Sequence, residues 1–139
     1  MALLGRLHPL LVHFPIALMV VAAMAEAIAS VTNDCQWRVV AVTNLRAAAV
    51  FGAAAAIAGW RLAMMPGAEA TATLDWHRWL GATAALATVA AAFASAGADG
   101  RSSIEFWVYR VTLLMAAALI AVTGHLGGVL VWGADFLRP

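Results

Sequence analysis

The amino-acid sequence predicts an all-α protein, an integral membrane four-helix bundle that forms a single transmembrane domain over residues 1–139. The composition is 65% hydrophobic and only 11% charged, and the mean hydropathy of +0.91 lies far outside the range of soluble domains. Four apolar segments are each long enough to cross a hydrocarbon core of about 30 Å at about 1.5 Å per residue. The residues between them are too few for a separate soluble domain.

The first predicted span covers residues 15–31 and follows the stretch "LHPLLVHFP", which contains two prolines. Pro9 suits a first helical position, because an N–H would have no partner there anyway. Pro15 falls inside the helix, where it lacks an N–H and clashes with the carbonyl group of Leu11. Residues 8–14 are therefore predicted as an irregular or kinked entry to the first helix.

The other predicted spans cover residues 39–63, 77–96 and 107–132, and polar or Gly- and Pro-containing stretches separate them. The second and third spans are rich in alanine, which permits close approach of helix backbones. The fourth contains "TGHLGGVLVWG", in which Gly124 and Gly128 have the small-xxx-small spacing of packed membrane helices. A bare glycine face suits either another helix or the flat face of a macrocycle, and the motif alone does not distinguish them.

Four crossings place every histidine on one side of the membrane: His8, His13, His77 and His125. The tryptophans form an interfacial belt, with Trp60, Trp76, Trp79 and Trp132 at the histidine level and Trp37 and Trp107 at the opposite one. The arginines divide evenly, with Arg6, Arg61, Arg78 and Arg138 on the histidine side and Arg38, Arg46, Arg101 and Arg110 on the other. The positive-inside rule therefore gives no orientation.

The formal net charge is +1, and no run of basic residues indicates a nucleic acid partner or a patch for anionic lipids. The single cysteine, Cys35, cannot form an internal disulfide, and the lack of a Cys-x-x-Cys-His motif excludes covalent attachment of a c-type haem. No Ser, Cys or carboxylate arrangement resembles a nucleophile with its base. We therefore expect a non-catalytic subunit rather than an enzyme.

The clustered histidines predict a site for haem b, because helical bundles build cofactor sites from side chains on facing helices. Such a haem needs two neutral imidazoles about 4 Å apart across its iron. By depth, His13 and His125 are the first choice for the axial ligands, since His125 lies deepest and inside a span. His8 and His77 are the second choice. They can form a second pair for a second haem, donate hydrogen bonds to the first pair, or only lie among the headgroups.

Two arginines fall at the same edge, Arg61 and Arg78, where their guanidinium groups can hold haem propionates through charge-assisted hydrogen bonds. Equally, they can be interfacial arginines that extend to water. A metal ion is a competing ligand, since the histidines together with Asp75, Glu69 or Asp135 can bind copper or zinc. The spacing of these residues matches no known metal-binding motif.

On the side opposite to the histidines, Glu26 of the first span and Arg46 of the second come out at similar depth. An ion pair between them would relieve the cost of two ionisable groups inside the membrane. We expect this pair to be structural, because no second acidic or histidine residue lies in mid-membrane to receive a proton.

The stretches "HPLLVHFPIAL", "HRWLGATAAL" and "TGHLGGVLVWG" resemble the small predicted integral membrane proteins of domain of unknown function 2231, over nearly the whole chain. The most specific positions are His8, Pro9, His13, Phe14, Pro15, Gly124, His125, Gly127 and Gly128. The resemblance implies a four-helix membrane module often found beside or fused to cytochromes and other redox proteins in bacteria. It thereby implies a multi-pass protein of the bacterial inner (cytoplasmic) membrane, but no activity.

These observations favour an electron-transfer subunit that binds one or two b-type haems. Its partners would be other membrane or periplasmic redox subunits, such as a c-type cytochrome, or a quinone. A second hypothesis is a cofactor-free membrane subunit that anchors or assembles a larger complex, with the histidines and glycines serving helix contacts. A third, less favoured, is a metal or proton conduit, which the histidine cluster supports and the missing mid-membrane polar path weakens. The lipid bilayer is a partner in all three.

Overall fold

The computed structural model describes residues 2–67, 71–98 and 104–135. Its elements are α1 (Ala2–Arg6), α2 (His8–Leu11), α3 (His13–Thr32), α4 (Cys35–Ala63), α5 (Ala72–Ala94), the 3₁₀ helix η1 (Ser95–Gly97) and α6 (Ile104–Trp132). The described residues contain no β-strand, and the predicted all-α class is confirmed. Four stretches are long and apolar enough to cross a membrane: His8–Thr32, Cys35–Ala63, Ala72–Gly97 and Ile104–Trp132. Each contains one predicted span and begins before it.

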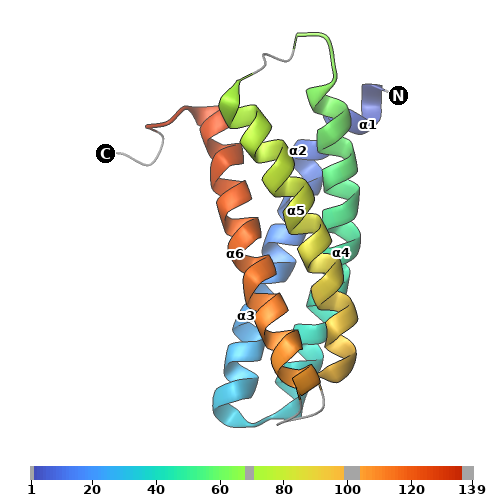
Figure 1. Cartoon of the computed structure of the whole chain (residues 1–139), viewed down its shortest axis with the longest axis vertical. Coiled ribbons are helices and arrows are strands. Elements are labelled where there is room, and N and C mark those ends of the chain that lie inside the picture. The colour runs from blue at the N-terminus through green and yellow to red at the C-terminus, as the bar shows by residue number, and fades with distance from the viewer. Residues whose placement is uncertain (1, 68–70, 99–103, 136–139) are drawn as a thin grey trace.

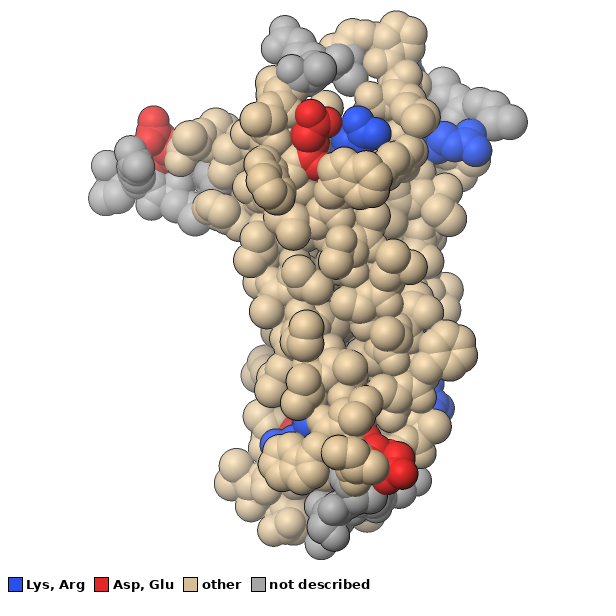
Figure 2. Space-filling view, in the orientation of Figure 1, with Lys and Arg blue, Asp and Glu red and all other residues tan. Residues whose placement is uncertain are grey.

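The four long helices form an antiparallel bundle (Figure 1). α3 packs against α4, α4 against α5, α5 against α6, and α6 back against α3. We call one end the histidine end, because it carries His8 and His77 together with the chain's N-terminal turns. We call the other the carboxylate end, because it carries the buried Glu26, near the turn from α3 to α4. On the face shown in Figure 2, charged side chains gather at the two ends and leave an uncharged belt between them, as a bilayer requires.

Residues 8–14, predicted as irregular or kinked, form helical turns that are interrupted at Val12. Val12 keeps right-handed helical backbone angles, and its N–H donates to the carbonyl of His8 at 3.0 Å. Pro15 lies in the first turn of α3, where its missing N–H costs little. His8 is therefore held on a helical turn rather than on an irregular loop.

Local polar contacts set the boundary between α3 and α4. Asn33 ends α3 in the left-handed conformation, with a φ of 58°. Asp34 then caps α4 by accepting the N–H of Gln36 at 2.9 Å. α4 consequently begins at Cys35, ahead of the predicted start of the second span.

The core is built largely from alanine, which lets membrane helices approach closely. The largest fully buried side chains are Tyr109, Met19, Leu45, Leu113 and Thr88. Within the described residues, α6 has no buried residue after Ala116, and α5 has none before Ala84. Burial in these two helices is therefore concentrated toward the carboxylate end.

Candidate functional site

The imidazole of His8 links α2 to α4. Its Nδ1 lies 2.9 Å from the backbone carbonyl oxygen of Ala55. A carbonyl oxygen only accepts hydrogen bonds, so Nδ1 must carry the hydrogen and donate it. In the neutral ring, Nε2 then holds the lone pair with which a histidine binds a metal.

His77 repeats this arrangement between α5 and α6. Its Nδ1 donates to the backbone carbonyl oxygen of Thr123 at 3.1 Å. The same argument leaves the lone pair on Nε2. His8 and His77 are both half-buried. Their hydrogen bonds place the hydrogen on Nδ1, which is a tautomer that metal-ligating histidines commonly adopt.

A glycine lies beside each imidazole. A Cβ atom added at Gly59 would lie 2.6 Å from Cε1 of His8, and one added at Gly127 would lie 3.1 Å from Cε1 of His77. Each glycine follows the residue whose carbonyl accepts the hydrogen bond by four positions. In an α-helix the carbonyl of residue i points toward residue i+4, so a side chain there would cover it. Glycine leaves the carbonyl open to the ring.

We call each histidine, with its glycine and accepting carbonyl, a half-site. Gly59 follows His8 by 51 positions, and Gly127 follows His77 by 50. In each helical hairpin the histidine lies near the start of the first helical segment and the glycine near the end of the second. The two hairpins therefore contribute equivalent half-sites.

The two half-sites meet at the histidine end. The ring centroids of His8 and His77 are 6.1 Å apart, with an angle of 80° between the ring planes. Two imidazoles on opposite sides of one metal ion, with metal–nitrogen bonds of about 2.0 Å, have ring centres about 6 Å apart. The observed separation fits two ligands of a shared ion.

His13 and His125, ranked first from their depth, lie on α3 and α6 and are both exposed. These helices are neighbours here, because a Cβ atom added at Gly124 would lie 3.6 Å from Cδ1 of Ile16. Gly124 therefore meets another helix, which is one of the two predicted roles of this glycine face, and Gly128 is half-buried. The structure thus brings together the histidine pair that depth ranked second.

Arg78 lies at the same end, next in sequence to His77. Its Cζ is 4.5 Å from the ring centroid of Trp60, and its Nη1 is 3.6 Å from Oδ1 of Asp75. Its Nε is buried and has no hydrogen-bond partner within the described part of the chain. Arg61 is exposed. Arg78 therefore retains an unused donor nitrogen close to the half-sites in sequence.

The metal-ion alternative involved three carboxylates. Within residues 2–67, 71–98 and 104–135, no group of three or more His, Cys, Asp or Glu side chains is placed to hold a metal ion. Asp75 is paired with Arg78, Asp135 is exposed, and Glu69 lies outside the described residues, as do Arg101 and Arg138.

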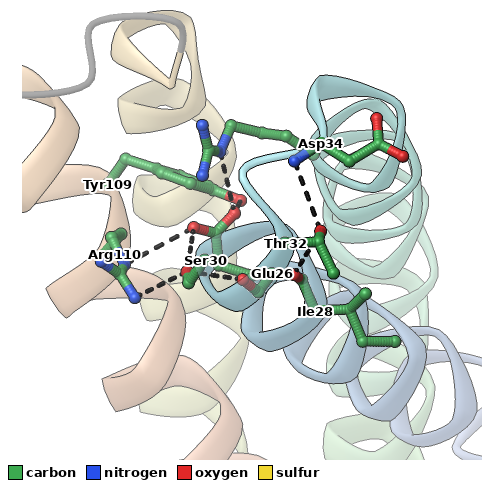
Figure 3. A network of polar contacts seen from close by, with 8 residues as sticks. Glu26, Ile28, Ser30, Thr32, Asp34, Tyr109 and Arg110 are labelled. Carbon is green, nitrogen blue, oxygen red and sulfur yellow. Dashed lines mark hydrogen bonds and ion pairs between the residues drawn. The ribbon is translucent and has the colours of Figure 1, made fainter.

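At the carboxylate end, Glu26 is only 4% exposed and gathers polar groups from three helices (Figure 3). Its Oε2 accepts from Oη of Tyr109 at 3.0 Å and lies 3.4 Å from Nε of Arg38. Its Oε1 lies 3.5 Å from Nε of Arg110. The hydroxyl of Ser30 donates to the Glu26 backbone carbonyl at 2.7 Å and accepts from Nη2 of Arg110 at 2.8 Å. Each oxygen of the buried carboxylate thus lies within 3.5 Å of an arginine nitrogen.

The predicted ion pair between Glu26 and Arg46 is wrong. Nε of Arg46 instead donates to the hydroxyl of Ser95 at 3.1 Å. Because α4 begins at Cys35 rather than at residue 39, Arg46 lies about one helical turn deeper than predicted and Arg38 falls within the helix. Counting helical turns from the capped start of α4 would have identified Arg38 as the partner of Glu26.

Comparison with known proteins agrees with the resemblance read from the histidine and glycine stretches. The model of one family, described as "Predicted membrane protein (DUF2231)", matches residues 6–136, which include all four histidines and both half-site glycines. No curated protein and no solved structure matches the chain.

Proposed function

The chain belongs to the DUF2231 family of predicted membrane proteins, and on this premise we propose that it is a membrane electron-transfer subunit that binds b-type haem. The residues that would hold its iron are His8 and His77. One observation carries the proposal: both rings donate from Nδ1 to a backbone carbonyl, which leaves Nε2 for iron, and their centroids are 6.1 Å apart. We rank this pair above His13 and His125, because both of those are exposed.

The chemistry of the donors fits a bis-histidine haem. Carbonyl groups that accept from Nδ1 orient each ring and raise the basicity of Nε2 toward a metal. Gly59 and Gly127 let the rings lie against α4 and α6 where a Cβ atom would intrude. Haem bound here would supply reversible one-electron redox chemistry at its iron.

Arg78 is the residue that we assign to a haem propionate. Its guanidinium group is held over Trp60 and beside Asp75, and its buried Nε lacks a partner within the described residues. A buried donor without an acceptor costs about 1–3 kcal/mol, and a propionate oxygen would accept from it. Arg61, exposed at the same end, is the second candidate.

Electrons would enter or leave at the histidine end. Trp60 and Trp79 pack edge to face there with ring centroids 5.3 Å apart, and Trp79 is 63% exposed. Exposed aromatic rings are common where proteins dock, so this rim suits another redox subunit such as a c-type cytochrome, or a quinone. The proposed location is the bacterial inner membrane.

The reduced-minus-oxidised absorption spectrum of the purified protein tests this function. A b-type haem has an α band near 560 nm, to within about 5 nm. His8→Ala and His77→Ala should each abolish the low-spin band. His13→Ala and His125→Ala are matched controls from the same end and should keep it. A colourless wild type, or a low-spin spectrum that survives in His8→Ala and His77→Ala, would reject the proposed site. Partial loss in both controls would indicate a second haem on His13 and His125.

A cofactor-free anchor or assembly subunit is the second candidate, and one feature of the half-sites favours it. Each histidine joins two helices through a side chain-to-backbone hydrogen bond. Hydrogen bonds between membrane helices stabilise by about 0.6–1.7 kcal/mol. If joining two helices is the only role of these histidines, the protein will have no visible absorption, and His8→Ala and His77→Ala will lower its unfolding temperature.

A further inference from the structure

A pocket of about 170 Å³ opens at the carboxylate end, at the opposite end of the bundle from the half-sites. It is lined by Ser30, Asn33, Arg38, Phe106, Trp107 and Arg110. Two guanidinium groups, a hydroxyl group and an amide therefore border one small space together with two aromatic rings.

The two arginines of the pocket share a single carboxylate. Nε of Arg38 lies 3.4 Å from one oxygen of Glu26, and Nε of Arg110 lies 3.5 Å from the other. Two cations and one anion leave an excess of one positive charge in this cluster. No acidic side chain is among the described residues that line the pocket: Asp34 caps α4, and Glu105 is exposed.

The pocket lies at the level where lipid headgroups are expected. Trp107 and Trp37, 53% and 41% exposed, mark this end as a membrane interface. The aromatic walls also hold the arginines. Arg38 lies 4.9 Å from the ring centroid of Phe106, and Arg110 lies 5.2 Å from that of Trp107.

We propose that this pocket binds the phosphate group of an anionic lipid headgroup, with Arg38 and Arg110 as its cationic ligands. Guanidinium groups match phosphate oxygens in both charge and hydrogen-bond geometry. Ser30 and Asn33 complete the polar wall. Inorganic phosphate offers the same oxygen atoms, so the experiment has to separate the two sources. The proposal does not depend on haem binding.

The test uses the full chain in nanodiscs of phosphatidylcholine, with or without a minor fraction of phosphatidylglycerol. Arg38→Gln removes the excess charge and leaves Glu26 paired with Arg110 alone, so a folded protein is expected. Arg110→Gln is the reciprocal variant, should Arg38→Gln fail to fold. Arg46→Gln is the matched control, because it removes an arginine that bonds Ser95 and does not line the pocket.

A ligand that binds the folded state raises the midpoint of thermal unfolding. We expect phosphatidylglycerol to raise it by a few degrees in the wild type and in Arg46→Gln, and to leave Arg38→Gln and Arg110→Gln unchanged. The same pattern with inorganic phosphate in phosphatidylcholine discs, in place of phosphatidylglycerol, would assign the pocket to free phosphate. The proposal would be overturned if neither phosphatidylglycerol nor inorganic phosphate raised the unfolding midpoint of the wild type, or if the midpoint rose equally in all variants.

A second measurement does not depend on unfolding. The preference of the protein for spin-labelled phosphatidylglycerol over spin-labelled phosphatidylcholine reports headgroup selectivity directly. Arg38→Gln should lose about fivefold in this preference, the factor that corresponds to about 1 kcal/mol for one arginine near a headgroup. Arg46→Gln should keep most of it, and an equal loss in the two variants would contradict a pocket-specific site.

Discussion

The two ends of the bundle are built differently. At the carboxylate end, each oxygen of the Glu26 carboxylate has a charged partner, and all the buried residues of α6 lie in the half of the helix nearer this end. Toward the histidine end, α6 has no buried residue after Ala116 and α5 none before Ala84, within the described residues. The imidazoles of His8 and His77 bond the backbone through Nδ1 and keep the Nε2 lone pair. Burial and ion pairing are therefore concentrated at one end, and the imidazoles that we propose for haem binding lie at the other.

Side-chain size explains much of this difference. Tyr109, Leu45 and Leu113 are fully buried and belong to the core cluster that reaches the carboxylate end. Toward the histidine end, the buried positions of α4 are Ala55 and Ala58. Stabilisation by burial scales with the apolar area removed from solvent, so the larger side chains contribute more of it.

Replacing Glu26 by alanine is the change with the largest expected effect. It leaves the guanidinium groups of Arg38 and Arg110 without their anion, and removing one partner of a buried ion pair costs about 3–5 kcal/mol of unfolding free energy. SDS titration in mixed micelles measures this free energy. Glu105→Ala, an exposed glutamate on α6, is the control and should change it by less than about 0.5 kcal/mol.

The Glu26→Ala variant also tests whether a change at the carboxylate end affects haem binding at the histidine end. As long as Glu26→Ala is folded, the absorption spectrum of any bound haem should remain that of the wild type. Equal unfolding free energies for Glu26→Ala and Glu105→Ala would contradict the stabilising role of the carboxylate network.

At the histidine end, alanine substitutions of three glycines should have graded effects. A Cβ atom at Gly59 would lie 2.6 Å from Cε1 of His8, so the ring must move, and we expect loss of haem and about 1–3 kcal/mol of stability. At Gly127 the distance to Cε1 of His77 is 3.1 Å. The ring therefore needs a smaller shift, and we expect only a partial loss of haem occupancy. At Gly124 the nearest atom lies at 3.6 Å, an ordinary contact, and haem binding should be unchanged.

Two quantities are measured for these three variants. The absorption spectrum gives the haem occupancy, and SDS titration gives the unfolding free energy. Alanine favours a helix over glycine by about 1 kcal/mol at each position, and this gain cancels when the three variants are compared. If all three lose haem to the same extent, the glycines do not act through the imidazoles.

The four spans could be predicted because the bilayer imposes one length on every crossing helix. The start of α4 was missed, because hydropathy marks only the apolar span, whereas the signal for this helix start is the N-cap residue Asp34. This shift from residue 39 to Cys35 corresponds to about 6 Å of helix rise. For that reason Glu26 pairs with Arg38, and Arg46 lies too deep to reach it.

The side of the bundle that carries the histidines could also be predicted, since it follows from the number of crossings. Which imidazoles meet could not, because this depends on the rotation of each helix about its own axis. His125 was ranked by depth, yet it is exposed. His77 is instead held at the backbone of α6, where Gly127 leaves the carbonyl of Thr123 open. A glycine four positions after an accepting residue becomes a signal only once the partner ring is known.

Apart from the control variants, Tyr109→Phe has the smallest predicted effect on the unfolding free energy, and it separates polar contact from packing at the carboxylate end. The Tyr109 hydroxyl donates to Oε2 of Glu26 at 3.0 Å, and the side chain is fully buried. Phenylalanine keeps the ring and removes this hydrogen bond alone, so we expect a loss of about 0.6–1.7 kcal/mol in unfolding free energy. The carboxylate retains both arginines, which makes the loss smaller than that of Glu26→Ala.

Thr88→Val is the matched control for this variant. Its fully buried hydroxyl donates to the carbonyl of Ala84 in the same helix at 2.7 Å, so its removal breaks no contact between helices and should cost little. In a Glu26→Ala background, Tyr109→Phe should cost less than it does alone, because the acceptor is already gone. SDS titration of the wild type, Glu26→Ala, Tyr109→Phe and the double variant measures this coupling. An equal loss in Thr88→Val and Tyr109→Phe would mean that burial alone, and not the polar contact between α3 and α6, holds this end together.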